Sequence, residues 1–159
     1  MHPIFHVDNS ANLNKHNLDM VRIGFDLYDA DLPFCQVVSI TGCVQQVNKV
    51  KAGELVGYNY NFVAKQNMKI AVVSVGYADG FLRGLIGLEI SVMGVKCKVL
   101  NVCMDCFMLD VSNIKINKGS RIFILNDENN LSLYAKQLNT SEYEVMTNFG
   151  RMRAKRILI

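Results

Sequence analysis

A tyrosine, a methionine and two aspartates stand at the ends of apolar runs in the middle of this chain. The phrase GYADG at 76–80 follows the run Ile70–Val75, and the phrase CMD at 103–105 follows the run Val99–Val102. Asp79-Gly80 is a strong turn dipeptide, because Gly adopts positive φ without strain and Asp tolerates it. Polar side chains at strand ends are typical of binding and catalytic sites, so we expect a site here.

The spacing Cys103-x-x-Cys106 is compatible with a redox or zinc site. No second pair of ligands follows at a suitable spacing, so the sequence predicts no metal centre. The chain has five Cys, an odd number, and its first residues contain no apolar segment typical of a secretory signal. Reduced thiols in a cytoplasmic protein are therefore the simpler interpretation.

These phrases, in this order, resemble the C-terminal part of alanine racemase, a bacterial enzyme that uses pyridoxal phosphate. The likeness runs from about His6 to Ile159. It implies an isomerase that interconverts L- and D-alanine and supplies D-alanine for peptidoglycan. Such a racemase needs one base on each face of the reacting carbon, with the cofactor ring as electron sink. In the family these bases are a barrel lysine and a tyrosine that the partner's C-terminal domain contributes.

Tyr58 matches the catalytic tyrosine of that family. It follows Gly57 and precedes Tyr77 by the family's interval. A phenol ordinarily titrates near pH 10, so a tyrosine base needs a neighbour that stabilises its phenolate. In the family, barrel residues outside this chain give that help. The alternative is a tyrosine packed in a strand with Tyr60 and Phe62.

Four further residues match the family's substrate positions. Tyr77 and Arg83 match a polar access corridor, where Arg83 would attract a carboxylate; otherwise Arg83 is a solvated cation. Met104 matches the residue whose backbone holds the substrate carboxylate. Asp105 matches the inner corridor, or else caps a turn. The family's usual Arg in this region is replaced by Asn101, which removes one charge from the corridor.

Near the N-terminus, the resemblance assigns residues to the cofactor. Arg22 matches the Arg that hydrogen-bonds the pyridine nitrogen of pyridoxal phosphate. Ser10, Gly24 and Phe25 match phosphate-binding positions, where a Gly allows a close backbone approach. Arg151 stands near the place where many members have a phosphate-binding Tyr, and it could contact the phosphate instead.

The elements that position these residues are short apolar, β-branched runs separated by turn residues. Such a pattern favours a closed or nearly closed antiparallel barrel. One helix is expected at Ser132–Leu138, capped by Asn130 or Ser132, and the chain closes on a basic strand at 151–159. The expected strands are Val37–Ile40, Val44–Val50, Tyr58–Phe62, Ile70–Val75, Leu88–Met93, Val95–Leu100, Met108–Val111 and Arg121–Leu125.

The fold class is therefore mainly β. By resemblance, residues 34–159 form an alanine racemase C-terminal-type antiparallel β-barrel, and residues 1–33 are a short α/β remnant of the end of a TIM-type barrel. A short helix at 11–18 and a strand at 20–25 are expected in the remnant. None of the chain's lysines stands in the family's cofactor-lysine phrase. The sequence thus predicts a fragment that binds the cofactor only with a complementary barrel and is inactive alone.

The totals exclude some classes. At 159 residues and 50% hydrophobic, the chain can form one domain with a core. Its net charge of +3 is too small to indicate nucleic-acid binding. No apolar run approaches the roughly 20 residues that span a bilayer.

Three hypotheses remain. The chain is one part of a racemase, as a homodimer or with a complementary N-terminal barrel chain; or it is a silent, degenerate fragment; or its barrel binds an anionic partner through the basic residues 151–156. Aromatic platforms interleaved with basic residues, which single-stranded nucleic acids favour, are absent from the sequence.

Overall fold

The protein is described from a computed structural model, which describes residues 3–8, 15–16, 18–24, 38–58, 62–149, 155 and 157. The chain divides into two compact units, Met1–Ser39 and Ile40–Ile159, and each is treated by itself. The domain boundary expected between residues 33 and 34 lies outside the described residues and stays a prediction. The basic strand expected at 151–159 also falls almost entirely outside them.

In the first unit, a local network surrounds the buried Asp8 carboxylate. This carboxylate accepts a hydrogen bond from the His16 backbone N–H at 3.1 Å and pairs with the His16 Nδ1. The hydrogen bond from the His16 side chain is the main cause that lowers the Asp8 pKa. The strand expected at 20–25 is wrong for its described part, which holds one isolated bridge at Arg22, and the described residues of 11–18 are not helical.

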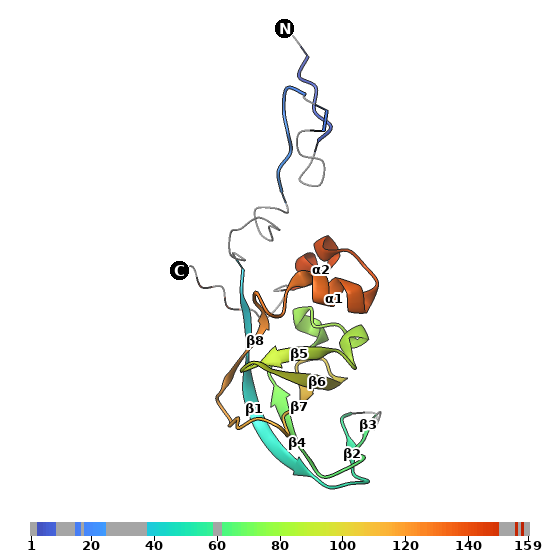
Figure 1. Ribbon diagram of the computed structural model, residues 1–159, viewed down its shortest axis with the longest axis vertical. Helices are drawn as coiled ribbons and strands as arrows, with labels where there is room; N and C mark the ends of the chain where they lie inside the picture. Colours follow the sequence, from blue (N-terminus) through green and yellow to red (C-terminus); the bar gives the residue numbers. More distant parts are fainter. Residues whose placement is uncertain are drawn as a thin grey trace. The chain divides into compact units, whose positions relative to one another are not determined.

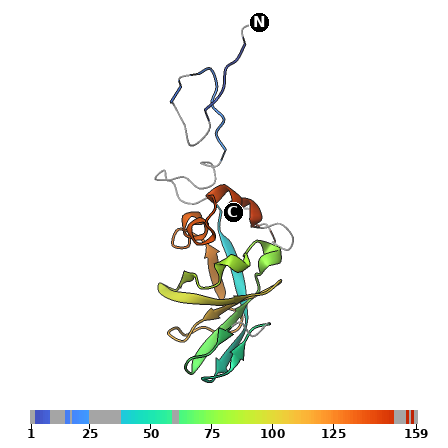
Figure 2. The same cartoon turned by 90° about the vertical axis from the view of Figure 1, so that its right-hand side faces the viewer.

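The second unit is built on a six-stranded antiparallel sheet with the order β5-β6-β7-β4-β1-β8 (Figures 1 and 2). Strands β2 and β3 pair with each other and form a separate two-stranded sheet. The strands are β1 (Ile40–Val50), β2 (Leu55–Val56), β3 (Phe62–Val63), β4 (Met68–Val73), β5 (Glu89–Val92), β6 (Val95–Val102), β7 (Phe107–Asp110) and β8 (Arg121–Leu125).

The side chain of Asn129 joins the two edge strands of the large sheet. Its Nδ2 donates to the Ser91 carbonyl of β5 at 2.9 Å and to the Phe123 carbonyl of β8 at 3.0 Å. Its Oδ1 accepts from the Ser91 N–H at 2.7 Å, and the residue is fully buried. The expected nearly closed antiparallel barrel is therefore confirmed, and one amide closes it.

Several of the expected strands have other bounds in the structure. The strand expected at Val37–Ile40 is wrong at Val38 and Ser39, which are not in a strand, and Ile40 begins the long strand β1. This strand contains the expected Val44–Val50, and its register shifts between Val44 and Gln46. The strand expected at Tyr58–Phe62 is wrong at its start, because Tyr58 lies in the turn that follows β2. Residues 59–61 lie outside the described part of the chain.

Two α-helices lie side by side at one end of the barrel, and the β2–β3 hairpin lies at the opposite end (Figures 1 and 2). Helix α1 (Leu131–Leu138) is capped by Asn130, whose side chain accepts from the Leu133 N–H, so this prediction is confirmed. Helix α2 (Glu142–Asn148) was not expected. Within the described residues, no helix has the length and apolar character that a membrane crossing requires.

Aromatic rings anchor these helices on the barrel. Phe81 stacks on Phe107 with ring centroids 4.3 Å apart, and Tyr134 of α1 meets Phe81 edge-on at 6.2 Å. The Tyr134 hydroxyl donates to the Ile124 carbonyl of β8. Burial raises the pKa of Tyr134, so its phenol stays protonated and continues to donate.

Because Asn129 joins the two edge strands, we expect Asn129→Ala to destabilise the fold strongly. The change removes three partly buried hydrogen bonds and leaves backbone groups of Ser91 and Phe123 without these partners, so we expect the free energy of unfolding to fall by about 3 kcal/mol. Urea denaturation followed by circular dichroism measures this. The exposed Asn117→Ala serves as the control and should change stability by less than about 0.5 kcal/mol. Equal effects of the two substitutions would contradict the closing role of Asn129.

Candidate functional site

Two loops that are distant in sequence dock on each other by backbone hydrogen bonds. The first is the loop at 76–80, which contains the 3-10 helix η3 (Tyr77–Asp79), and the second is the turn at 103–106 between β6 and β7. The Tyr77 N–H donates to the Cys103 carbonyl and the Ala78 N–H donates to the Met104 carbonyl, both at 3.0 Å. The two phrases singled out in the sequence are thus neighbours in space.

Gly76 makes this docking sterically possible. A Cβ atom at this position would lie 2.5 Å from the carbonyl oxygens of Cys103 and Met104, closer than real Cβ contacts permit. On the other side of the loop, a Cβ on Gly80 would lie 2.1 Å from the carbonyl oxygen of Asn148, at the end of α2. The 76–80 loop is therefore held between the 103–106 turn and α2.

Asp79 stabilises the loop from inside. It is buried, and its Oδ2 accepts from the Gly76 N–H at 2.9 Å, which closes the short turn. Gly80 follows with φ of +101°, a left-handed conformation that favours Gly. The expected Asp79-Gly80 turn is confirmed, and Asp79 is a structural residue of the loop.

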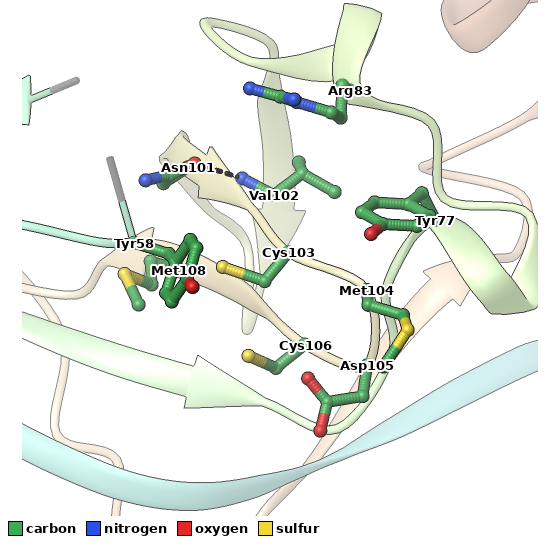
Figure 3. A pocket seen from close by; sticks show the side chains of 10 residues that line it. All are labelled: Tyr58, Tyr77, Arg83, Asn101, Val102, Cys103, Met104, Asp105, Cys106 and Met108. Atoms are coloured by element: carbon green, nitrogen blue, oxygen red, sulfur yellow. Dashed lines mark hydrogen bonds between the residues drawn. The ribbon is translucent and has the colours of Figure 1, made fainter. Parts of the chain in front are cut away.

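The docked loops form one wall of a cavity of about 650 Å³. Figure 3 shows that β6, the 103–106 turn and η4 (Arg83–Leu85) surround it. All five residues expected in catalysis or substrate binding border this cavity. Its lining is Tyr58, Tyr77, Arg83, Asn101, Val102, Cys103, Met104, Asp105, Cys106 and Met108.

Tyr58 lies on the rim and is 84% exposed. The turn that carries it rests on Asn101, which is 3% exposed and whose Oδ1 accepts from the Val102 N–H at 2.8 Å. Asn101 follows a bulge in β6, where the pairing with β7 shifts between Val99 and Asn101. Bulges redirect side chains and are frequent beside functional sites. Here the bulge places Asn101 under Gly57.

The cavity offers a cation, Arg83, and a free backbone donor, the Met104 N–H. Arg83 is exposed, is the only cation among the ten lining residues, and forms no ion pair with any described residue. In the part of the chain that the structure describes, no group accepts a hydrogen bond from the Met104 N–H. A guanidinium and a free N–H are the donors that carboxylates and phosphates bind.

Three sulfur-bearing residues also line the cavity and were not assigned to it from the sequence: Cys103, Cys106 and Met108. Cys106 and Met108 are two positions apart at the start of β7, so the two-residue repeat of a strand places them on one face. The alternation of side chains along β7, extended back by one residue to Cys106, was the sequence signal that could have assigned these residues to the cavity. Burial, with Cys103 and Asp105 as further causes, raises the pKa of the Cys106 thiol to about 12. Among the described residues, no group of three or more His, Cys, Asp or Glu could hold a metal ion.

The residues expected to bind a cofactor belong to the first unit. The Arg22 guanidinium donates to the Val7 carbonyl at 3.1 Å and is otherwise exposed. Gly24 has open space beside its Cα, since no atom lies within 4 Å of a Cβ built there. Ser10 and Phe25 lie outside the described residues.

Residues 37–158 match the family model of the alanine racemase C-terminal domain. The chain belongs to the alanine racemase family. The family recognised from the sequence is therefore confirmed. Alanine racemase of Thermodesulfovibrio yellowstonii is 34% identical over 99% of this chain, and that of Staphylococcus carnosus is 34% identical over 94%. The aligned region is 47% and 44% of these relatives, so the chain spans about half the length of the curated relatives it matches.

Solved alanine racemase structures have the same fold. The enzyme of Acinetobacter baumannii superposes with a TM-score of 0.83 and 30% identity over 92% of this chain and 45% of its own. The enzyme of Bartonella henselae, solved with covalently bound pyridoxal phosphate, gives 0.86 and 25% over 95% of this chain and 46% of its own. A family member thus carries this cofactor through a covalent bond.

The cavity of this chain does not by itself fit a covalently held pyridoxal phosphate. The covalent bond of this cofactor is made by a lysine amine. None of the ten lining residues is Lys. The cavity wall can therefore contribute to such a site only beside another segment that supplies the amine.

The contact between Gly57 and Asn101 makes a testable prediction. A Cβ at residue 57 would lie 1.8 Å from the Asn101 Nδ2, and Gly57 has φ of +87°. We expect Gly57→Ala to lower the free energy of unfolding by about 2–3 kcal/mol through strain and overpacking. Urea denaturation measures it.

Gly53→Ala is the matched control. Gly53 has the same φ of +87°, but nothing lies within 4 Å of its added Cβ. We expect Gly53→Ala to lower the free energy of unfolding by about 1 kcal/mol, which is the contribution of backbone strain alone. If both variants lose equal stability, Asn101 does not support the turn that carries Tyr58.

Proposed function

We propose that this chain supplies the C-terminal-domain side of an alanine racemase active site, where L- and D-alanine interconvert. The observation that carries the proposal is the gathering of Tyr58, Tyr77, Arg83, Met104 and Asp105 around one cavity, in a chain of this family. Because the chain spans about half of its relatives, the proposed activity belongs to the assembled protein and not to this chain alone. The proposed product serves peptidoglycan synthesis.

Tyr58 is the proposed acid–base residue on one face of the substrate Cα. Its Oη would take a proton from that carbon in one direction of the reaction and return one in the other. A phenol loses its proton near pH 10 in water, so the site must stabilise the phenolate. Among the described residues no group hydrogen-bonds to the Tyr58 hydroxyl. The stabilising group would therefore come from the segment that covers the rim.

Arg83 and the Met104 N–H are the proposed recognition groups for the substrate carboxylate. With Asn101 in place of the family's usual Arg, Arg83 is the only lining cation, so it would attract the carboxylate by itself. Tyr77 and Asp105, which also line the cavity, would complete a polar access corridor. The amino acids that fit such a corridor are small, alanine first.

We further propose that the rim is covered by a barrel that carries the cofactor lysine, either on a complementary chain or on the second subunit of a dimer. The exposure of Tyr58, Tyr77 and Met104, at 84%, 44% and 58%, supports a covering partner. Pyridoxal phosphate supplies an electron sink when it is bound. Arg22, with Ser10, Gly24 and Phe25, is proposed to contact its ring nitrogen and phosphate beside that barrel.

We place this reaction in the cytoplasm. The thiols of Cys43, Cys97, Cys103 and Cys106 are free. Free thiols on a chain that contains several of them are typical of a reducing compartment.

A chimera tests the function. It joins the N-terminal part of the Thermodesulfovibrio yellowstonii racemase to residues 34–159 of this chain, and chiral chromatography follows D-alanine formation. We expect racemisation by the chimera and none by this chain alone. Tyr58→Phe should lower kcat at least about 100-fold, because it removes the proton carrier on one face.

Tyr143→Phe is the matched control for that loss. Tyr143 is half-exposed on α2 and does not line the cavity, so its substitution should leave kcat unchanged. A folded, cofactor-loaded chimera in which Tyr58→Phe keeps the full rate would contradict the assignment. A folded, loaded chimera without racemisation would favour a degenerate domain.

A further inference from the structure

Cys103 and Cys106 face each other across the turn between β6 and β7. The Cys103 N–H donates to the Cys106 carbonyl at 2.8 Å, and the next pair inward, Val102 and Phe107, is in register. Directly opposed residues of an antiparallel pair have Cα atoms about 5.5 Å apart and side chains on one face. Figure 3 shows both sulfur atoms directed to the same side of the cavity.

The Cys106 thiol follows the Asp105 carboxyl in the chain and stands opposite the Cys103 thiol, and both neighbours act on its ionisation. Burial first, and then the neighbouring Cys103 and Asp105, raise the pKa of Cys106 to about 12, so it is a neutral thiol at pH 7. Only the thiolate form attacks a disulfide. At neutral pH Cys106 is therefore a poor first nucleophile toward an external disulfide, which leaves the first attack to Cys103.

The spacing of the two residues suits a disulfide bond. Bridged cysteines have Cα atoms about 4.4–6.8 Å apart, and an opposed hairpin pair falls inside that range. Both residues are only partly buried and border an open cavity, so a small reagent can reach them. The other described thiols, Cys43 in β1 and Cys97 in β6, have no cysteine opposite them in the sheet.

We propose that Cys103 and Cys106 are a modification site that small-molecule disulfides convert into a reversible Cys103–Cys106 bond, and that this bond clamps the 103–106 turn. In the first step, the Cys103 sulfur attacks one sulfur of the external disulfide. A mixed disulfide forms on Cys103, the external S–S bond breaks, and the first leaving thiolate takes a proton from water.

In the second step, the Cys106 sulfur attacks the Cys103 sulfur of the mixed disulfide. Cys106 loses its proton to water, and the second external thiolate leaves and takes up a proton from water. Two protein thiols are thereby oxidised to one disulfide, and one external disulfide is reduced to two thiols. An excess of external thiol reverses both steps.

The bond acts on the cavity through the docked loops. The carbonyls of Cys103 and Met104 accept the hydrogen bonds from Tyr77 and Ala78. A crosslink that stops opening of the 103–106 turn keeps both acceptors in place. Oxidation therefore stabilises the contact between the 103–106 turn and the 76–80 loop.

The test uses the full chain with oxidised glutathione as the probe, followed by N-ethylmaleimide labelling and peptide mass mapping. We expect a peptide with an internal Cys103–Cys106 bond that excess reduced glutathione restores to two labelled thiols. We also expect slower amide hydrogen exchange at Tyr77 and Ala78 in the oxidised chain. Ring closure should become faster as the pH rises toward 12, because the thiolate fraction of Cys106 grows.

Variants separate the two steps. Cys106→Ser should stop at a mixed disulfide on Cys103, and Cys103→Ser should leave Cys106 unmodified at neutral pH. Cys43→Ser and Cys97→Ser are the matched controls and should oxidise like the parent chain. Complete labelling of Cys103 and Cys106 after excess oxidant would overturn the site, and unchanged exchange at Tyr77 and Ala78 in the oxidised chain would overturn the clamp. Neither readout depends on racemase activity.

Discussion

The pocket depends on one steric condition, the close backbone approach of the 76–80 loop to the 103–106 turn. Gly76 permits it, and two backbone hydrogen bonds, from Tyr77 and Ala78, maintain it. Because this contact is made by backbone atoms, it fixes the Cα positions of residues 77 and 104 independently of which side chains they carry. A larger residue at 76 would separate the loops and divide the cavity wall into two independent pieces.

The barrel sets that contact by holding the strands from which both loops leave. β4 precedes one loop and β6 precedes the other, and both pair with β7 between them. The bulge in β6 adds the third part, because it directs Asn101 toward the turn of Tyr58. Asn129, which follows the pocket residues in the sequence, joins the two edge strands of the same sheet. Site and closure are thus parts of one strand arrangement.

Much of this was predictable from the sequence. Most strands could be predicted from the β-branched runs, because strand formation depends on the pattern of neighbouring residues. Asn130 was one of the two residues expected to cap α1. Helix α2 was missed although Ser141 and Glu144 carry the spacing of a capping box, and Ser141 does accept from the Glu144 N–H.

The turn at Tyr58 and the contact of Gly57 with Asn101 could not be predicted, because they depend on a bulge and on residues far apart in the chain. Gly76 lies against the 103–106 turn and Gly80 lies against the end of α2, so the loop is restrained at both of its ends. A segment restrained in this way loses little conformational entropy when a ligand arrives. Tyr58 lies on an exposed turn, so this residue would lose conformational entropy when it becomes ordered around a ligand. For the substrate proposed above, affinity would then depend on how the rim is ordered, with the loop wall as a preformed template.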